Sequence, residues 1–169
     1  ILPLLILFYG SQKCDWLFKR HPRAYLMRGP LVGMAALFIV FIIACGVEAT
    51  TPYLPLINPI DIAQAFMVAT FIYAWRLKAG VFGWLPSTLS TPLIALIGFI
   101  WINVVMLRAI HQYAGIDYTV NALWASALVQ MALSVLWISA ALVAKYMSRR
   151  MASRGLWVGG AVLRGLILV

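Results

Sequence analysis

The sequence is poor in charged side chains, and poorest in acids. Only 10% of its 169 residues are charged and four are Asp or Glu, while 64% are hydrophobic. Its mean hydropathy is +0.98. Soluble globular domains are about half apolar and about a quarter charged, so this chain has more apolar surface than such a domain can bury. The composition excludes a soluble globular protein and indicates a membrane protein.

Cysteine is also scarce, and the familiar catalytic motifs are missing. Cys14 falls in a basic loop and Cys45 deep in an apolar run, so neither a disulfide nor a shared metal site is expected. The sequence has no Gly-rich phosphate loop, no His/Cys metal spacing, no nucleophile elbow and no paired carboxylates at helical spacing. We therefore expect no metal, no cofactor and no catalytic residues of a known class.

The net charge of +9 comes from short basic clusters between apolar runs. Nucleic-acid-binding domains instead carry a basic face with interleaved aromatic residues, which does not occur outside these runs. We expect no nucleic-acid partner. The expected partners are the lipid bilayer and other transmembrane helices, either of the same parent protein or of a membrane complex.

The apolar runs have about the length that a helix needs to cross a bilayer, roughly 20 residues. We predict an all-α, polytopic transmembrane helical bundle of about six spans. Their bounds are about 1–10, 30–47, 59–75, 92–111, 121–146 and 155–169. The chain opens without methionine and closes inside an apolar run. We therefore expect a single helical region that is a fragment of a larger membrane protein, with its first and last spans truncated.

Two helix starts carry capping signals. Asn58-Pro59 and Thr91-Pro92 each place a capping side chain before a proline, whose missing N–H costs nothing in the first turn. Asp61 follows in the first turn, where a carboxylate favours the positive end of the helix dipole and completes a box-like cap.

The basic residues predict the orientation in the membrane. Three loops, at 11–29, 76–91 and 146–154, hold ten of the 13 basic residues, and Lys145 adjoins the last loop, so these loops are expected in the cytoplasm. Three of the four acids, Glu48, Asp61 and Asp117, fall near the opposite side. The pattern predicts a protein that crosses its membrane several times, with these loops on the inner side.

Arg108, His111 and Asp117 form a predicted polar cluster at the outer surface. Arg108 and His111 are three residues apart and share one helical face, and Asp117 lies in the next loop. In the first interpretation, Arg108 extends to the headgroups and pairs with Asp117 or a lipid phosphate. The alternative is an anion or lipid-headgroup site in which His111 moves a proton near neutral pH.

A second polar group consists of residues expected to form hydrogen bonds between helices. Ser126, Gln130 and Ser134 repeat every four residues on the fifth predicted span, and Gln130 is expected to bond Asn103 or Gln64 on a neighbouring helix. Arg164 lies about ten residues into the last run, where it requires an internal partner unless that helix begins later.

Residues 101–137 (WINVVMLRAIHQYAGIDYTVNALWASALVQMALSVLW) and 154–163 (RGLWVGGAVL) resemble the C-terminal part of large polytopic bacterial membrane proteins, the family of domain of unknown function 2339. The resemblance extends over about 58–169. It rests on these residues: Arg108, His111, Gly115, Asp117, Ser126, Gln130, Ser134, Trp137 and Trp157. Arg164 departs from the pattern. The resemblance implies a longer parent protein in a bacterial inner membrane and implies no activity.

Three functional hypotheses follow. The first is a non-catalytic scaffold or assembly module of the bacterial envelope, whose polar residues hold helices in register. The second is a transporter of a small solute or lipid, which requires Gln130, Asn103 and Arg164 to face one aqueous space. The third is an outer-face enzyme or binding site for an anionic lipid-linked substrate, with Arg108 as the charge clamp and His111 as the acid or base.

Overall fold

The computed structural model describes residues 1–13, 28–48 and 53–151, and all regular structure in these ranges is helical. The elements are α1 (Leu2–Lys13), α3 (Gly29–Cys45), α4 (Pro59–Arg76), the 3-10 turn η2 (Gly80–Gly83), α5 (Ser87–Ala114), α6 (Val120–Ala125) and α7 (Ala127–Met151). The prediction of an all-α fold is confirmed.

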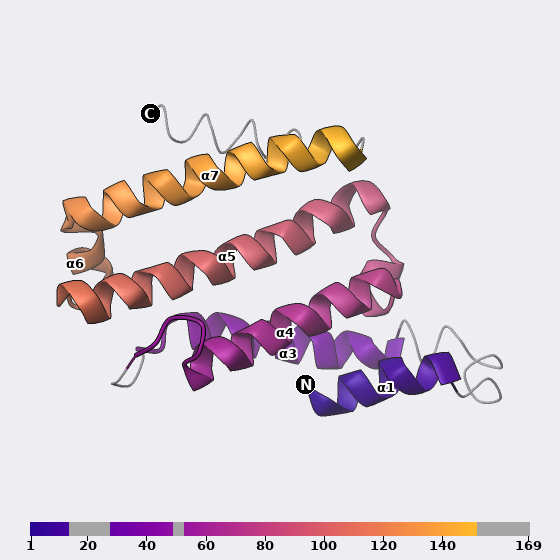
Figure 1. Cartoon of the computed structure of the whole chain (residues 1–169). Coiled ribbons are helices and arrows are strands. Elements are labelled where there is room, and N and C mark those ends of the chain that lie inside the picture. The colour runs from indigo at the N-terminus through magenta and orange to yellow at the C-terminus, as the bar shows by residue number, and fades with distance from the viewer. Residues whose placement is uncertain (14–27, 49–52, 152–169) are drawn as a thin grey trace.

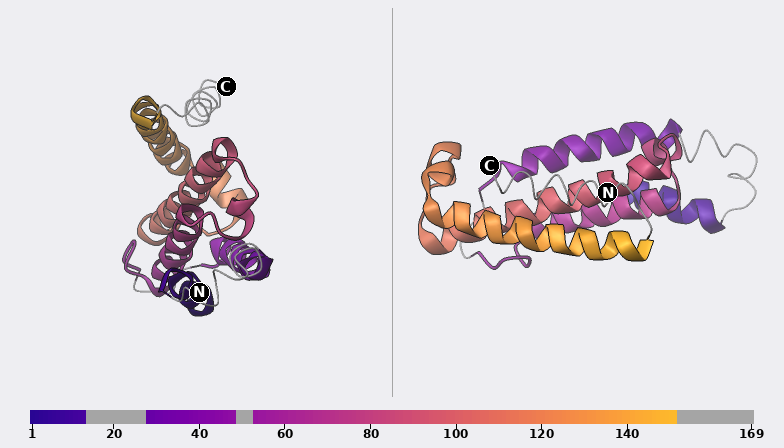
Figure 2. Two further views of the ribbon diagram at one scale, coloured as in Figure 1. Left: turned by 90° about the vertical axis from the view of Figure 1, so that its right-hand side faces the viewer. Right: turned by 90° about the horizontal axis from the view of Figure 1, so that it is seen from above.

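The axes of the long helices are roughly aligned, and successive helices run in opposite directions, with α5 between α4 and α7 (Figures 1 and 2). α4 contacts α3 on one side and α5 on another, and α7 packs against α5. α3 and α5 end where α4 and α7 begin, so these four termini lie at the same end of the bundle (Figure 1). We refer to this end as the Arg108 end, after the side chain buried there.

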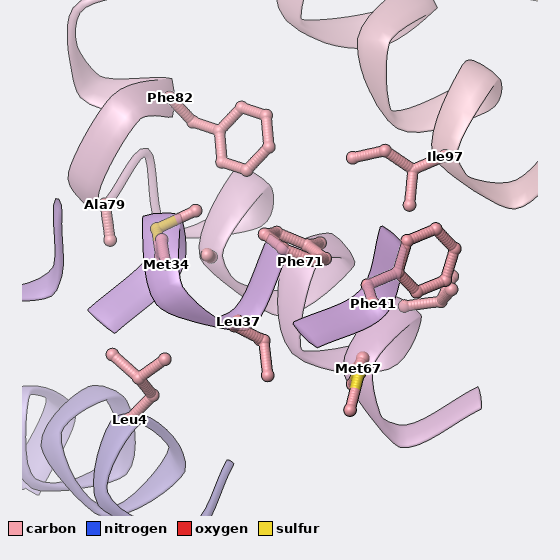
Figure 3. Close-up of a cluster of buried hydrophobic side chains, with 11 residues drawn as sticks. Leu4, Met34, Leu37, Phe41, Met67, Phe71, Ala79, Phe82 and Ile97 are labelled. Atoms are coloured by element: carbon pink, nitrogen blue, oxygen red, sulfur yellow. The ribbon is translucent and has the colours of Figure 1, made fainter. Parts of the chain in front are cut away.

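The apolar core lies where α1, α3, α4, η2 and α5 meet (Figure 3). Phe41 of α3 and Ala74 of α4 are fully buried in it, and the ring of Phe38 meets that of Phe71 edge to face at 6.3 Å. Lipid tails are as apolar as these side chains, so in a bilayer close packing stabilises such contacts more than removal from water does. Apolar contacts of this kind hold the helices together without fixing their register.

The two predicted helix starts have different outcomes. The start at Asn58-Pro59 is confirmed, because the Asn58 side chain accepts a hydrogen bond from Ile60 N at 3.0 Å. The start at Thr91-Pro92 is wrong, because α5 begins at Ser87 and contains Pro92. The added turn is held against α4 by a hydrogen bond of 3.1 Å from Trp75 Nε1 to Ser90 Oγ. This contact helps to offset the backbone hydrogen bond that Pro92 cannot donate.

The predicted helix at 121–146 is broken near its start. Ser126 is extended, with φ −82° and ψ 118°, and separates α6 from α7. Its hydroxyl accepts from Val129 N at 3.4 Å, while Gln130 Nε2 donates to Trp124 O at 2.8 Å. Side chains of this kind compete with the helix for backbone groups, which favours a break. Gln130 therefore lies in the first turn of α7 and not near the middle of a span.

Within the described residues, two helical stretches are long and apolar enough to cross a membrane: Thr88–Ala114 and Ala127–Tyr146. Pro30–Cys45 is apolar but shorter. The number of six spans stays a prediction. The run 155–169, with Trp157 and Arg164, and most of the basic loop at 11–29 lie outside the described residues.

We predict that Gly80→Ala destabilises the bundle. Gly80 has φ +56°, and a Cβ there would overlap Met34 Sδ in the core. Left-handed strain and overpacking together predict a loss of about 2 kcal/mol or more in the free energy of unfolding.

Gly98→Ala is the matched control, because a Cβ at this position of α5 meets nothing within 4 Å. It is expected to leave stability unchanged or to raise it by up to about 1 kcal/mol. Thermal unfolding in detergent micelles measures both variants. Equal losses would show that the contact with Met34 does not constrain this turn.

Candidate functional site

Arg108 occupies the last turns of α5 with its side chain fully buried. Its Nη1 lies 2.6 Å from Oδ1 of Asp61 and 2.9 Å from Oε1 of Gln64, and both partners have 0% exposure. These two side chains come from the first turns of α4. A guanidinium and a carboxylate removed from water are stable only when they are paired and their remaining hydrogen-bonding groups are satisfied.

Arg108 also closes the C-terminal end of α3. Its Nε donates to Val47 O at 3.2 Å, and Nη2 donates to Ala44 O. The hydroxyl of Tyr118, from the loop after α5, donates to Cys45 O at 3.0 Å. The last carbonyls of a helix lack partners within it and carry partial negative charge, so a buried cation is favourable there. Arg108 thereby joins the end of α3 to the start of α4.

The remaining polar atoms around the pair also have partners. Tyr53 donates its hydroxyl to Oδ2 of Asp61 at 2.7 Å, and Gln64 Nε2 donates to Cys45 Sγ at 3.4 Å. We call Arg108, Asp61, Gln64 and Tyr53 the Arg108 network. It connects α3, α4, α5 and the loop before α4 with charge-assisted hydrogen bonds, which are stronger than neutral ones.

His111 and Glu48 form a second, more exposed pair one turn further along α5. His111 Nε2 lies 2.8 Å from Oε1 of Glu48, with 17% and 64% of the two side chains exposed. His111 Nδ1 faces Ile116 O at 2.5 Å, and the ring meets that of Tyr118 at 5.6 Å. Both ring nitrogens face oxygen acceptors, so an imidazole protonated on both donates to each, and a neutral ring donates to only one.

Burial raises the pKa of two phenols at this end of the bundle. For Tyr53, burial has the largest effect, and the hydrogen bond to Asp61 raises the pKa further because it favours the protonated phenol. Burial also raises the pKa of Tyr118, while the positive charge of Arg108 acts in the opposite direction. Both hydroxyls are therefore held in the form that donates hydrogen bonds.

The predicted cluster of Arg108, His111 and Asp117 is only partly assembled. Arg108 and His111 lie in the same part of α5, but Arg108 pairs with Asp61, and Asp117 is exposed in the following loop. The expected pairing of Arg108 with Asp117 or a headgroup is therefore wrong. The sequence predicts that Asp61 completes a helix cap and lies near the outer side, but it does not predict the pair with Arg108. An acid and an arginine near the same side were visible in the sequence, but their pairing depends on which helices are neighbours.

The expected hydrogen bonds between helices also have different partners. Asn103 Oδ1 accepts from Trp137 Nε1 at 2.9 Å, which connects α5 to α7. Gln130 is exposed and bonds Trp124 O, so its expected bond to Asn103 or Gln64 is wrong. Ser134 donates to Gln130 O at 2.8 Å within α7. Sequence reasoning missed Tyr53 and Tyr118, which carry no signal apart from their location in loops.

The described residues contain no group of three or more His, Cys, Asp or Glu side chains that could hold a metal ion. An open apolar cavity of about 700 Å³ lies between Met106 of α5 and the side chains of α7 from Leu128 to Ser139. None of the side chains that line it belongs to the Arg108 network. The cavity and the buried charges are therefore separate features.

Comparison with known proteins supports a membrane location. The family described as "Predicted membrane protein (DUF2339)" matches residues 1–169, so the match extends beyond the resemblance over about 58–169 and includes the first 57 residues. No curated protein and no solved structure matches the chain.

Breaking the Arg108 network at one partner should destabilise the bundle strongly. Asp61→Asn leaves the Arg108 charge buried and unbalanced, which predicts a loss of about 3–5 kcal/mol in the free energy of unfolding. Adding Arg108→Met to Asp61→Asn removes that unbalanced charge, so the double variant should be more stable than Asp61→Asn alone. Thermal and denaturant unfolding in micelles measure the series.

Glu48→Gln is the matched control, because it makes the same chemical change in an acid that is 64% exposed and is paired with His111. Its expected cost is about 0–1 kcal/mol. A loss as large as that of Asp61→Asn would contradict the assignment of Arg108 and Asp61 as the pair that stabilises this end.

Alkaline unfolding provides a separate test of the buried phenols. The pKa of Tyr53 and of Tyr118 is raised by folding, so both bind their protons more tightly in the folded state. Their contribution to stability is complete below the unfolded pKa of about 10 and is lost as the pH rises above it. The double variant Tyr53→Phe/Tyr118→Phe should lose stability less steeply above about pH 10 than the native chain. Identical slopes would show that these hydroxyls do not contribute.

Proposed function

Because this chain belongs to the DUF2339 family of predicted membrane proteins, we propose that it is a non-catalytic helical module of a larger bacterial inner-membrane protein. Its role is to act as a scaffold or assembly component of the envelope. The single observation that carries this proposal is that the buried polar side chains of the Arg108 network are bonded to one another and to the ends of the helices. Arg108, Asp61 and Gln64 have 0% exposure, and each is hydrogen-bonded to another helix.

This bonding favours a structural role because catalysis and transport need polar groups that can reach a ligand. A general acid or base must lie within hydrogen-bond reach of its substrate, and transporter residues line a cavity or a water path. The donors of Arg108 are directed at Asp61, Gln64 and the end of α3. Binding a ligand there would first require these bonds to break.

The distribution of charge supports the proposed orientation. The start of α3, the end of α4 and the end of α7 lie opposite the Arg108 end (Figure 1), and the three basic stretches lie at or next to them. The stretch 146–154, predicted as a loop, is helical as far as Met151, because α7 continues to that residue. Glu48, Asp61 and Asp117 lie at or near the Arg108 end. Since basic loops are retained in the cytoplasm, we place the Arg108 end on the outer side of the membrane.

The enzyme alternative retains one favourable observation, the partial exposure of His111. The same geometry disfavours an anionic substrate, because Glu48 occupies the exposed side of the imidazole and Asp61 balances Arg108. The transporter alternative has less support. Asn103 bonds Trp137 and Phe99 O, while Gln130 is directed at the backbone break near Ser126, so the two amides do not share a space.

Labelling with a membrane-impermeant maleimide tests the proposal against transport. In a background with Cys14→Ser and Cys45→Ala, single cysteines replace Thr70 in α4 and Ser134 in α7. We expect neither to react in intact, oriented vesicles, because the proposal includes no water path along these helices. Asp117→Cys is the positive control, since Asp117 is exposed in a loop.

Reaction at Ser134→Cys together with further positions along α7 would overturn the proposal and favour transport. Labelling confined to Asp117→Cys and other loop positions would support it. Each variant must first show the same thermal stability as the wild type. Labelling that results from unfolding is then not mistaken for a water path.

A further inference from the structure

A short segment before α4 lies over the buried ion pair. It comprises residues 53–58, and its two ends, Tyr53 and Asn58, are 3% and 4% exposed. Between them, Leu54, Leu56 and Ile57 are 51–67% exposed. The segment is thus anchored at both ends while its middle makes little contact with the bundle. We call residues 53–58 the latch.

The middle of the latch is strained. Leu56 has φ +69°, in the left-handed region that is unfavourable for a residue with a Cβ. Its side chain is 51% exposed, so burial does little to offset this cost. The conformation is held by a hydrogen bond of 3.3 Å from Leu56 N to Oδ2 of Asp61 and by a turn in which Ile57 N and Asn58 N both donate to Leu54 O at 3.1 Å. Strain of this kind persists only where the surroundings enforce it.

Asp61 holds the latch and the helices with different oxygens. Oδ1 receives Arg108, while Oδ2 receives both the Tyr53 hydroxyl and Leu56 N. The latch is also tied to α5, because the Tyr53 hydroxyl lies 3.2 Å from Val105 O and Tyr113 donates to Tyr53 O at 3.0 Å. The bonds to Oδ2 can break while the bond between Oδ1 and Arg108 remains.

We propose that residues 53–58 are a latch that opens and closes over the Asp61–Arg108 pair while the helices stay packed. Closed, the latch keeps water from Asp61. Open, it presents Oδ2 of Asp61 to solvent at the Arg108 end and relieves the left-handed backbone of Leu56. The stored strain and the few contacts of the exposed middle make this segment less stable than the helices around it. The inference does not depend on the proposed scaffold function.

Hydrogen exchange of the full chain in micelles, followed by mass spectrometry, tests the latch. Leu56→Gly removes the strain, because glycine adopts positive φ readily. It should close the latch more tightly and slow exchange of residues 53–58 by about two- to fivefold after correction for intrinsic rates. Lys78→Gly is the matched control. Lys78 also has positive φ, at +49°, but lies beyond the other end of α4. It should leave exchange of 53–58 unchanged.

Tyr53→Phe should have the opposite effect on exchange, because it removes the hydroxyl that binds Asp61. Exchange of residues 53–58 should become about fivefold faster or more, while exchange in the middle of α4 and α5 stays the same. Two results would overturn the latch. One is that Leu56→Gly has no effect or the same effect as Lys78→Gly. The other is that 53–58 exchanges in step with α4 and α5 in every variant, which means that it opens only when the bundle unfolds. The Leu56→Gly arm remains decisive even if Tyr53→Phe does not fold.

Discussion

The structure depends on one constraint, the cost of placing the Arg108 guanidinium among apolar helices. An isolated charge in such surroundings costs more than any single apolar contact can supply, so its donors must be matched by acceptors in fixed positions. Asp61, Gln64 and the backbone at the end of α3 provide them. Three chain segments must therefore meet at one point. The ends of α3 and α5 and the start of α4 are determined together, because none of them can shift without leaving a buried polar group unmatched.

Apolar packing and polar hydrogen bonds stabilise this bundle in different ways. The contacts of the apolar cluster around Phe41, Phe71 and Ile97 are not directional, so they tolerate some sliding of one helix along another. The Arg108 network and the hydrogen bond between Asn103 and Trp137 are directional, and each crosses between helices. They lie on different faces of α5, toward α4 and toward α7. The register of α5 is thus fixed on both sides by polar groups, while the apolar residues supply most of the contact.

Local features of the fold could be predicted from the sequence, and pairings across the bundle could not. The apolar runs and the cap at Asn58 depend on neighbouring residues, so they could be located without a structure. The start of α5 was predicted wrongly because proline is common in the first turn of a helix, which pointed to Pro92. The helix begins one turn earlier, where Ser90 is hydrogen-bonded to Trp75 of α4. The break at Ser126 depends on Gln130 reaching back to Trp124 O. The partner of Arg108 depends on α4 lying beside α5, which the composition of neither helix specifies.

The residues that suggested the family resemblance have a common physical role where the structure describes them. Gly115 ends α5 with φ +66°, a conformation that suits glycine, and its N–H donates to His111 O. Ser126 caps α7, Gln130 bonds the backbone across the break, and Trp137 joins α7 to α5. Arg108 closes the end of α3. Each satisfies a backbone or side-chain group that would otherwise lack a partner in an apolar medium. The five residues named here thus end helices or join them to one another, which is the kind of role that the scaffold proposal assigns to the motif.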